Sequence, residues 1–110
     1  MAKEAVKIQE GGVIDYTAGA TIANGAVVPL TDRVGVALDN AVSGDTISLA
    51  LEGVFEMTGK TANTFAVGTV VYFDAAAREV TTTVGANIKA GIAVTDLAGG
   101  TAGVVNVKIG

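Results

Sequence analysis

The sequence predicts a small all-β fold, a single-domain β-sandwich or barrel with little helix. Apolar residues recur at every second position in several short runs, which is typical of half-buried strands. Turn signals containing glycine recur about every ten residues, the spacing seen in sandwiches and barrels. The 110 residues are 50% hydrophobic but only 5% aromatic. Short Ala and Val side chains must therefore fill the core, so its layers lie close together.

The elements can be assigned in order along the chain. Residues 1–10 are either an N-terminal arm or a first strand, and residues 11–110 form one β domain. Residues 74–78 are long enough for one helical turn or a loop. β-branched and short apolar runs predict strands in residues 26–30, 34–38, 46–52, 69–74, 78–84, 90–94 and 104–109.

The strictest alternation lies in residues 46–52 and 104–109. Their inward faces are predicted to carry Ile47, Leu49 and Leu51 in the first, and Val105, Val107 and Ile109 in the second. Gly35 and Gly91 lie inside short strands, which indicates a bulge or a close backbone approach. Turns are predicted at residues 24–25, 43–45, 58–60 and 99–100.

The two halves of the chain resemble each other. Residues 22–28 and 65–71 share the pattern apolar, Ala, any, Gly, any, Val, Val. Gly35-Val36-Ala37 is matched by Gly91-Ile92-Ala93, and each is followed by a glycine turn and an alternating strand. The second half carries an extra segment, residues 74–88. We therefore expect two similar β units.

Composition excludes several function classes. A formal net charge of −4 argues against a nucleic-acid partner. There is no Cys and no His, which removes thiol nucleophiles, thiolate metal sites and the commonest general base. No run approaches the roughly 18 apolar residues of a membrane helix, and the charged N-terminus lacks the features of a signal peptide. Synthesis in a cytoplasm, with no membrane partner, is expected.

One segment resembles a phosphate-binding P-loop. Residues 53–61 read Gly-Val-Phe-Glu-Met-Thr-Gly-Lys-Thr, but five residues separate Gly53 from Gly59 where the motif has four. No amphipathic helix follows to direct its N-terminus at a phosphate. We instead predict a hairpin tip at residues 57–61, with Gly59 at positive φ and Lys60 in solvent.

The carboxylates are scattered, mostly at strand ends or beside glycine, as turn residues that bond their own backbone. A glycosidase-type acid pair would need a cleft that this thin core does not offer. Asp39-Asn40 and residues 43–45 could supply oxygen ligands to calcium, but no EF-hand spacing is present. Arg33 and Arg78 are the only arginines, predicted to be solvated or to form ion pairs at a subunit boundary. From residue 11 onward the acidic positions are Asp15, Asp32, Asp39, Asp45, Glu52, Glu56, Asp74, Glu79 and Asp96.

Several segments, taken in order along about residues 8–110, together resemble a known protein family. They include residues 13–20, 22–28, 34–37, 51–57, 68–74 and 91–94. Together they resemble the capsid decoration, or cement, proteins of tailed phages. Members of this family are often labelled as phage recombinases of the RecA/RadA type, a label that the out-of-register P-loop argues against. Phe73 stands where relatives often carry Trp.

The resemblance implies an all-β, non-enzymatic protein that binds the outer surface of the assembled capsid and stabilises it. It implies no catalytic residue, cofactor or metal. The implied partners are the lattice of the major capsid protein and further copies of the chain, as a trimer rather than a dimer. Alternatives are a tail or baseplate β domain, a nucleotide-binding protein, or a carbohydrate-binding module, for which only Tyr16 and Tyr72 could stack on sugars.

Overall fold

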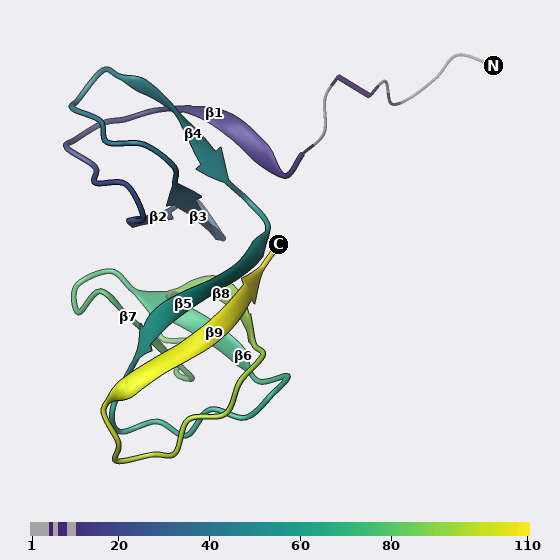
Figure 1. Ribbon diagram of the computed structural model, residues 1–110, viewed down its shortest axis with the longest axis vertical. Helices are drawn as coiled ribbons and strands as arrows, with labels where there is room; N and C mark the ends of the chain where they lie inside the picture. Colours follow the sequence, from purple (N-terminus) through teal and green to yellow (C-terminus); the bar gives the residue numbers. More distant parts are fainter. Residues whose placement is uncertain (1–4, 6, 9–10) are drawn as a thin grey trace.

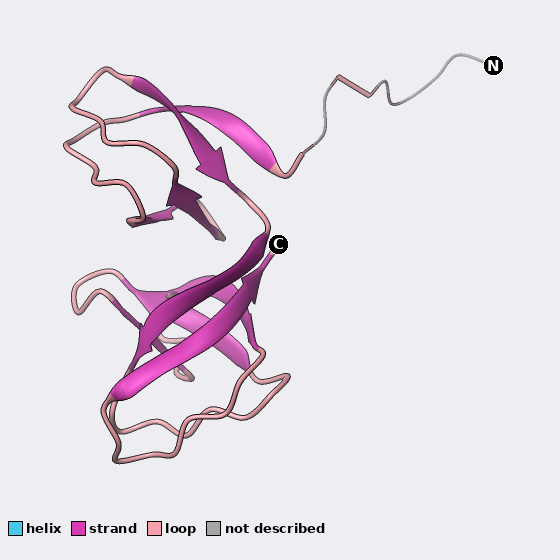
Figure 2. Cartoon of the chain, viewed as in Figure 1, coloured by secondary structure: helices cyan, strands magenta, loops and turns pink. Residues whose placement is uncertain are grey.

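The computed structural model describes residues 5, 7–8 and 11–110. Within these residues the chain forms β-strands and no helix (Figure 1 and Figure 2). The predicted all-β class is therefore confirmed. The strands are β1 (Val13–Thr17), β2 (Val27–Pro29), β3 (Val34–Ala37), β4 (Thr46–Ala50), β5 (Gly53–Gly59), β6 (Val70–Asp74), β7 (Glu79–Thr81), β8 (Ile88–Ala93) and β9 (Gly103–Ile109).

The strands form an open sheet and a closed barrel. The sheet has the order β1-β4-β3-β2, and the barrel has the order β5-β7-β6-β8-β9. All pairings are antiparallel except the contact of β5 with β7, a single parallel bridge between Gly59 and Val80. In Figure 1 the sheet lies above the barrel, and β4 leads directly into β5.

Each predicted strand run contains a strand, with ends that differ by a few residues. The inward face of β9 is confirmed, since Val105, Val107 and Ile109 are fully buried. In β4 the prediction holds for Ile47 and Leu49, but Leu51 lies beyond the strand and is only partly buried, and Ala50 on the opposite face is buried as well. Residues 78–84 yield only the short β7, and residues 74–78 form a turn. Its backbone is held by Asp74, whose Oδ1 accepts the N–H groups of Ala76 and Ala77 at 3.0 and 3.1 Å.

Two strands, β1 and β5, were not among the predicted runs. In β1 only Ile14 and Tyr16 turn inward, and both are half-buried, so its alternation is weak. The predicted arm or strand in residues 1–10 lies largely outside the described residues. Of these ten, Ala5, Lys7 and Ile8 are described, and they are exposed and not in a strand.

The predicted resemblance between the two halves is confirmed by matching hydrogen bonds. The N–H of Gly25 donates to the carbonyl of Ala37 at 2.8 Å, and the N–H of Gly68 donates to that of Ala93 at 2.7 Å. Both glycines have positive φ, 86° and 92°. Isolated antiparallel bridges join Ile22 to Ala41 in one half and Phe65 to Leu97 in the other.

The strand orders match as well. The equivalent strands of the two halves are β1 and β5, β4 and β9, β3 and β8, and β2 and β6. The extra segment of the second half contributes β7, which pairs with β6 on one side and β5 on the other. This inserted strand closes the second half into a barrel. Because the first half has no such strand, it remains an open sheet.

The sheet and the barrel share a core. Val34, Val36 and Ala50 of the sheet pack in one buried cluster with the barrel interior, which includes Phe73 and Ile109. The other face of the sheet holds a second cluster around Leu49 and Ile47. Strand β4 therefore serves both cores, since neighbouring residues on a strand point to opposite faces.

The two glycines predicted to allow close approach do so. A Cβ on Gly35 would lie 2.6 Å from the side chain of Leu49, and one on Gly91 would overlap the backbone carbonyl oxygen of Lys108. Gly91 also lies at a β-bulge, because the register of β6 against β8 shifts between Val71 and Tyr72. Both sites therefore require the absence of a side chain.

Truncating Leu49 tests the two-sided packing of β4. Leu49→Ala is expected to lower the free energy of unfolding by about 2–5 kcal/mol, because the side chain is fully buried. Urea titration followed by circular dichroism measures this. Val42→Ala is the control, since Val42 is 59% exposed and its truncation is expected to change stability little. A near-zero effect at Leu49 would contradict the register of β4.

Adding a methyl group at Gly91 tests the contact of β8 with β9. Gly91→Ala is expected to destabilise the fold by at least about 1–3 kcal/mol, since the backbone of β9 must move. Gly19→Ala is the matched control, because no atom lies within 4 Å of a Cβ there. Equal melting temperatures for the two variants would show that the bulge is not tightly packed.

Candidate functional site

The P-loop-like segment is a strand. Residues 53–59 are β5, and Gly59 is buried within it. The predicted hairpin tip with Gly59 at positive φ is therefore wrong. A Cβ on Gly59 would lie 2.8 Å from Leu97 Cδ2 and 3.0 Å from Phe65 Cε2, so the glycine serves packing at the barrel seam. Lys60 is exposed, as predicted, and begins the turn that follows.

Several carboxylates hold turns. Asp45 Oδ2 accepts the N–H of Val42 at 3.0 Å, and Asp74 holds the turn after β6. Asp96 Oδ1 accepts the N–H of Val67 at 2.9 Å. In the first half, Asn40 Oδ1 makes the equivalent bond to the N–H of Asn24 at 2.8 Å. Among the described residues, no three His, Cys, Asp or Glu side chains gather as a metal site would require.

The two arginines have different environments. Arg33 makes an exposed ion pair with Asp32 at 3.7 Å. Arg78 joins the two halves: its guanidinium donates to the carbonyl of Val27 in β2 at 2.9 Å and lies 4.9 Å from the ring centre of Phe73. No local pattern could predict the bond between Arg78 and Val27, because the two residues are 51 positions apart.

Neither tyrosine forms an exposed stacking platform. Tyr16 is half-buried and packs against the cluster around Leu49. Tyr72, in β6, is also only half exposed. Sugar-binding faces present a flat ring to solvent, so these positions do not favour carbohydrate binding.

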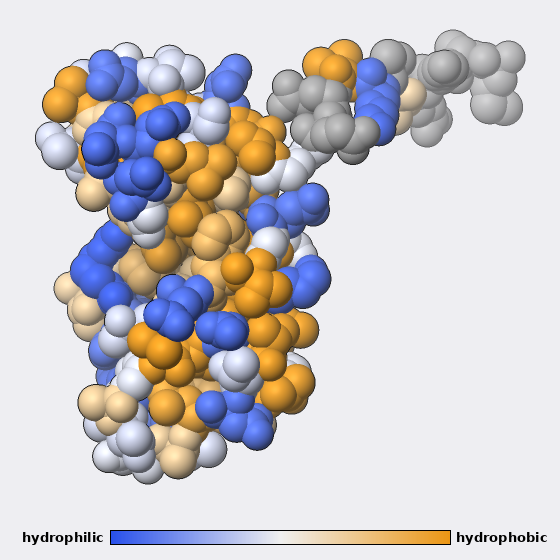
Figure 3. Space-filling view, in the orientation of Figure 1, coloured by the Kyte–Doolittle hydropathy of each residue, from blue (hydrophilic) through white to orange (hydrophobic). Residues whose placement is uncertain are grey.

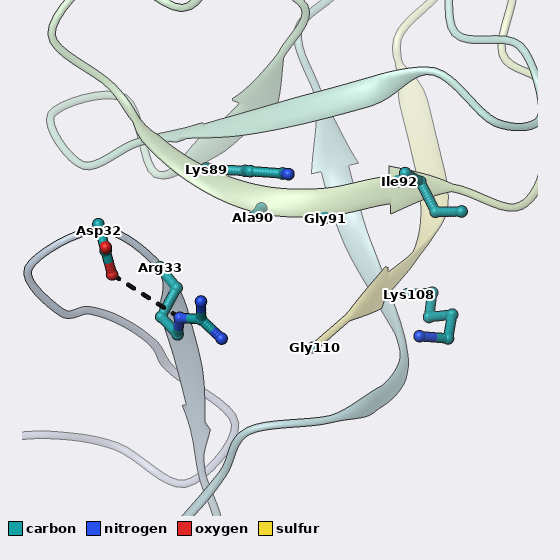
Figure 4. A pocket seen from close by; sticks show the side chains of 8 residues that line it. All are labelled: Asp32, Arg33, Lys89, Ala90, Gly91, Ile92, Lys108 and Gly110. Atoms are coloured by element: carbon teal, nitrogen blue, oxygen red, sulfur yellow. Dashed lines mark ion pairs between the residues drawn. The ribbon is translucent and has the colours of Figure 1, made fainter.

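A pocket of about 210 Å³ lies at the junction of the sheet and the barrel. Its lining includes Arg33, which precedes β3, Lys89 of β8 and Lys108 of β9. In Figure 4 the Arg33 guanidinium points into the space below β8, Lys89 extends along the upper side of that strand, and the Lys108 side chain lies on the side of β9 away from Arg33. Asp32 is the only acidic side chain in the lining. We call these three cations the cationic junction.

An exposed apolar row runs across the outside of the barrel beside this junction. Val54, Lys108, Ile92 and Val70 are direct neighbours across β5, β9, β8 and β6. Val54 is 57% exposed, Val70 38% and Ile92 37%. Figure 3 shows hydrophobic surface over the barrel interspersed with charged patches. Lys108 and Ile92 belong to both the row and the pocket.

The cationic junction and the apolar row offer charge and apolar contact, which is the chemistry of a binding surface. Sequence reasoning singled out Arg33 but not Lys89 or Lys108. The resemblance between the halves did point to Ile92, since it aligns this residue with Val36. The pairing of Ile92 with Lys108, however, depends on the register of β8 against β9, which could not be predicted from the sequence.

The described residues include no helix long and apolar enough to cross a membrane. A family model described as phage cement protein matches residues 8–109. No curated protein and no solved structure matches the chain.

Nucleotide binding at Lys60 is tested by thermal shift. ATP with magnesium is expected to leave the melting temperature of the wild type and of Lys60→Ala unchanged, because β5 offers no loop that could cradle phosphate. A nucleotide at a hundred times its Kd would add about 2.7 kcal/mol of stability. A rise in the melting temperature that Lys60→Ala abolishes would contradict this expectation.

Proposed function

The chain belongs to the phage cement protein family, and on that premise we propose that it is a non-enzymatic decoration protein of the phage head. It would bind the outer surface of the assembled capsid and stabilise the shell. The family match over residues 8–109 carries this proposal. It covers both the open sheet and the barrel, so the role belongs to the whole described fold and not to one half.

The fold supports a role that depends on the fixed shape of the molecule. Two buried clusters and a closed barrel fix the relative positions of the surface groups. Many copies bound around a symmetric lattice turn a modest affinity at each site into persistent occupancy. A protein that binds only the assembled shell stabilises it by mass action.

Self-association would strengthen this effect. We propose a homotrimer, with a dimer as the alternative, that bridges neighbouring subunits of the major capsid protein. Strand β1 is an edge of its sheet, which makes it available for pairing with another chain. The opposite edge strand, β2, is protected by Pro29, the single proline of the chain, and by the bond from Arg78.

Binding to capsids is tested by mixing the purified protein with empty mature heads and with unexpanded precursors. After sedimentation, the protein is expected to remain with the mature heads, and cryo-electron microscopy is expected to place it on their outer surface. Decorated heads are expected to resist heat and low ionic strength better than bare heads. Retention by neither particle, or density on the tail instead, would contradict the proposal.

A further inference from the structure

We propose that the cationic junction and the apolar row together form the docking surface for an extended acidic segment of the shell subunit. This inference rests on the proposed function. It adds which face of the molecule meets the capsid and what chemistry that face recognises.

In the first half, the face equivalent to the apolar row is covered at its centre, while Val13 at its end is 45% exposed. In that half, Val13, Ala50, Val36 and Val27 form the equivalent row across β1, β4, β3 and β2. Val36 and Ala50 there are only 5% exposed, because the barrel packs on them. The same face of the second half keeps valine and isoleucine at three of its four positions but has nothing over it among the described residues.

The fourth position distinguishes the two rows. Where the covered row has Ala50, the exposed row has Lys108, which pairs with both Val54 and Ile92. Lysine here forbids burial against a dry apolar surface, since a desolvated cation needs a partner. An occupant of this face must therefore combine apolar contacts with at least one negative charge.

The charge distribution favours an acidic occupant. The chain has a net charge of −4, yet three of its seven Lys and Arg residues line the pocket at the junction. The single acidic side chain there, Asp32, is 84% exposed and already lies beside Arg33. Lys89 and Lys108 are exposed, and they lie on strands that the barrel holds in place.

The same charges argue against a two-fold contact in which this face meets the same face of a second copy. A two-fold interface would place the cationic junction of one copy against or close to that of the other, which like-charge repulsion opposes. An extended acidic segment avoids this, because alternate residues can place carboxylates near Lys108 and Lys89 and apolar side chains on Ile92 and Val54.

Charge reversal tests the docking surface. The double variant Lys89→Glu/Lys108→Glu is expected to bind mature heads at least about tenfold more weakly than the wild type at low salt. Lys60→Glu is the matched control, because Lys60 is an exposed lysine that does not line the junction. It is expected to bind like the wild type. Wild-type binding is expected to weaken as the salt concentration rises, whereas the double variant depends less on salt.

The apolar row is tested with Val54→Thr/Ile92→Thr, which retain β-branched side chains in the strands. This variant is expected to weaken head binding at all salt concentrations. Val84→Thr is the control, since Val84 is 58% exposed and lies outside the row. Unchanged melting temperatures verify that each variant is folded.

The outcomes separate the two proposals. Failure of the wild type to bind heads contradicts the proposed function. Binding of the wild type that neither double variant weakens overturns the docking surface and leaves the proposed function standing. A change of oligomeric state in the free charge-reversed protein, measured by sedimentation velocity, would show that this face contacts another copy and would also overturn the inference.

Discussion

Closure of the barrel by β7 is the constraint on which the rest of the structure depends. Strand β7 has three residues, yet it joins β6 to β5 and turns an open sheet into a closed one. Its Val80 fills the interior with no exposed surface, and the Thr81 hydroxyl donates to Asn63 Oδ1 at 2.6 Å. A closed barrel has no free edge and a fixed interior, so it can provide a rigid surface on which the open sheet packs.

The first half shows what the same pattern becomes without this strand. Its interior residues Ile22 and Leu51 are only partly buried, whereas Phe65 and Ile109, at the equivalent positions of the barrel, are almost fully buried. The open sheet compensates by using its second face: Val34, Val36 and Ala50 pack on the barrel. The two halves are therefore not independent repeats, because the open one gains much of its burial from the closed one.

The sequence was sufficient for those features that are local or repeated. The period-two patterns around Leu49 and Val107 located β4 and β9, and the glycine patterns around Gly25 and Gly68 revealed the duplication. The sequence was not sufficient to predict contacts between residues that lie far apart along the chain. Gly59 was interpreted as a turn residue because Thr-Gly-Lys is a local turn signal, but Leu97 and Phe65, brought in by barrel closure, are what require a glycine. For the same reason, the convergence of Arg33, Lys89 and Lys108 could not be predicted from their spacing.

The duplication also explains how the chain comes to have an exposed apolar row beside its own core. Two equivalent faces arise from one pattern, and the fold needs only one of them for its own core. Covering the row that contains Ala50 stabilises the molecule, while the row that contains Lys108 remains outside. Lys108, which stands where the first half has Ala50, thus distinguishes the exposed row from the row that the barrel covers. The two faces also differ in curvature, because one belongs to an open sheet and the other to the outside of a closed barrel.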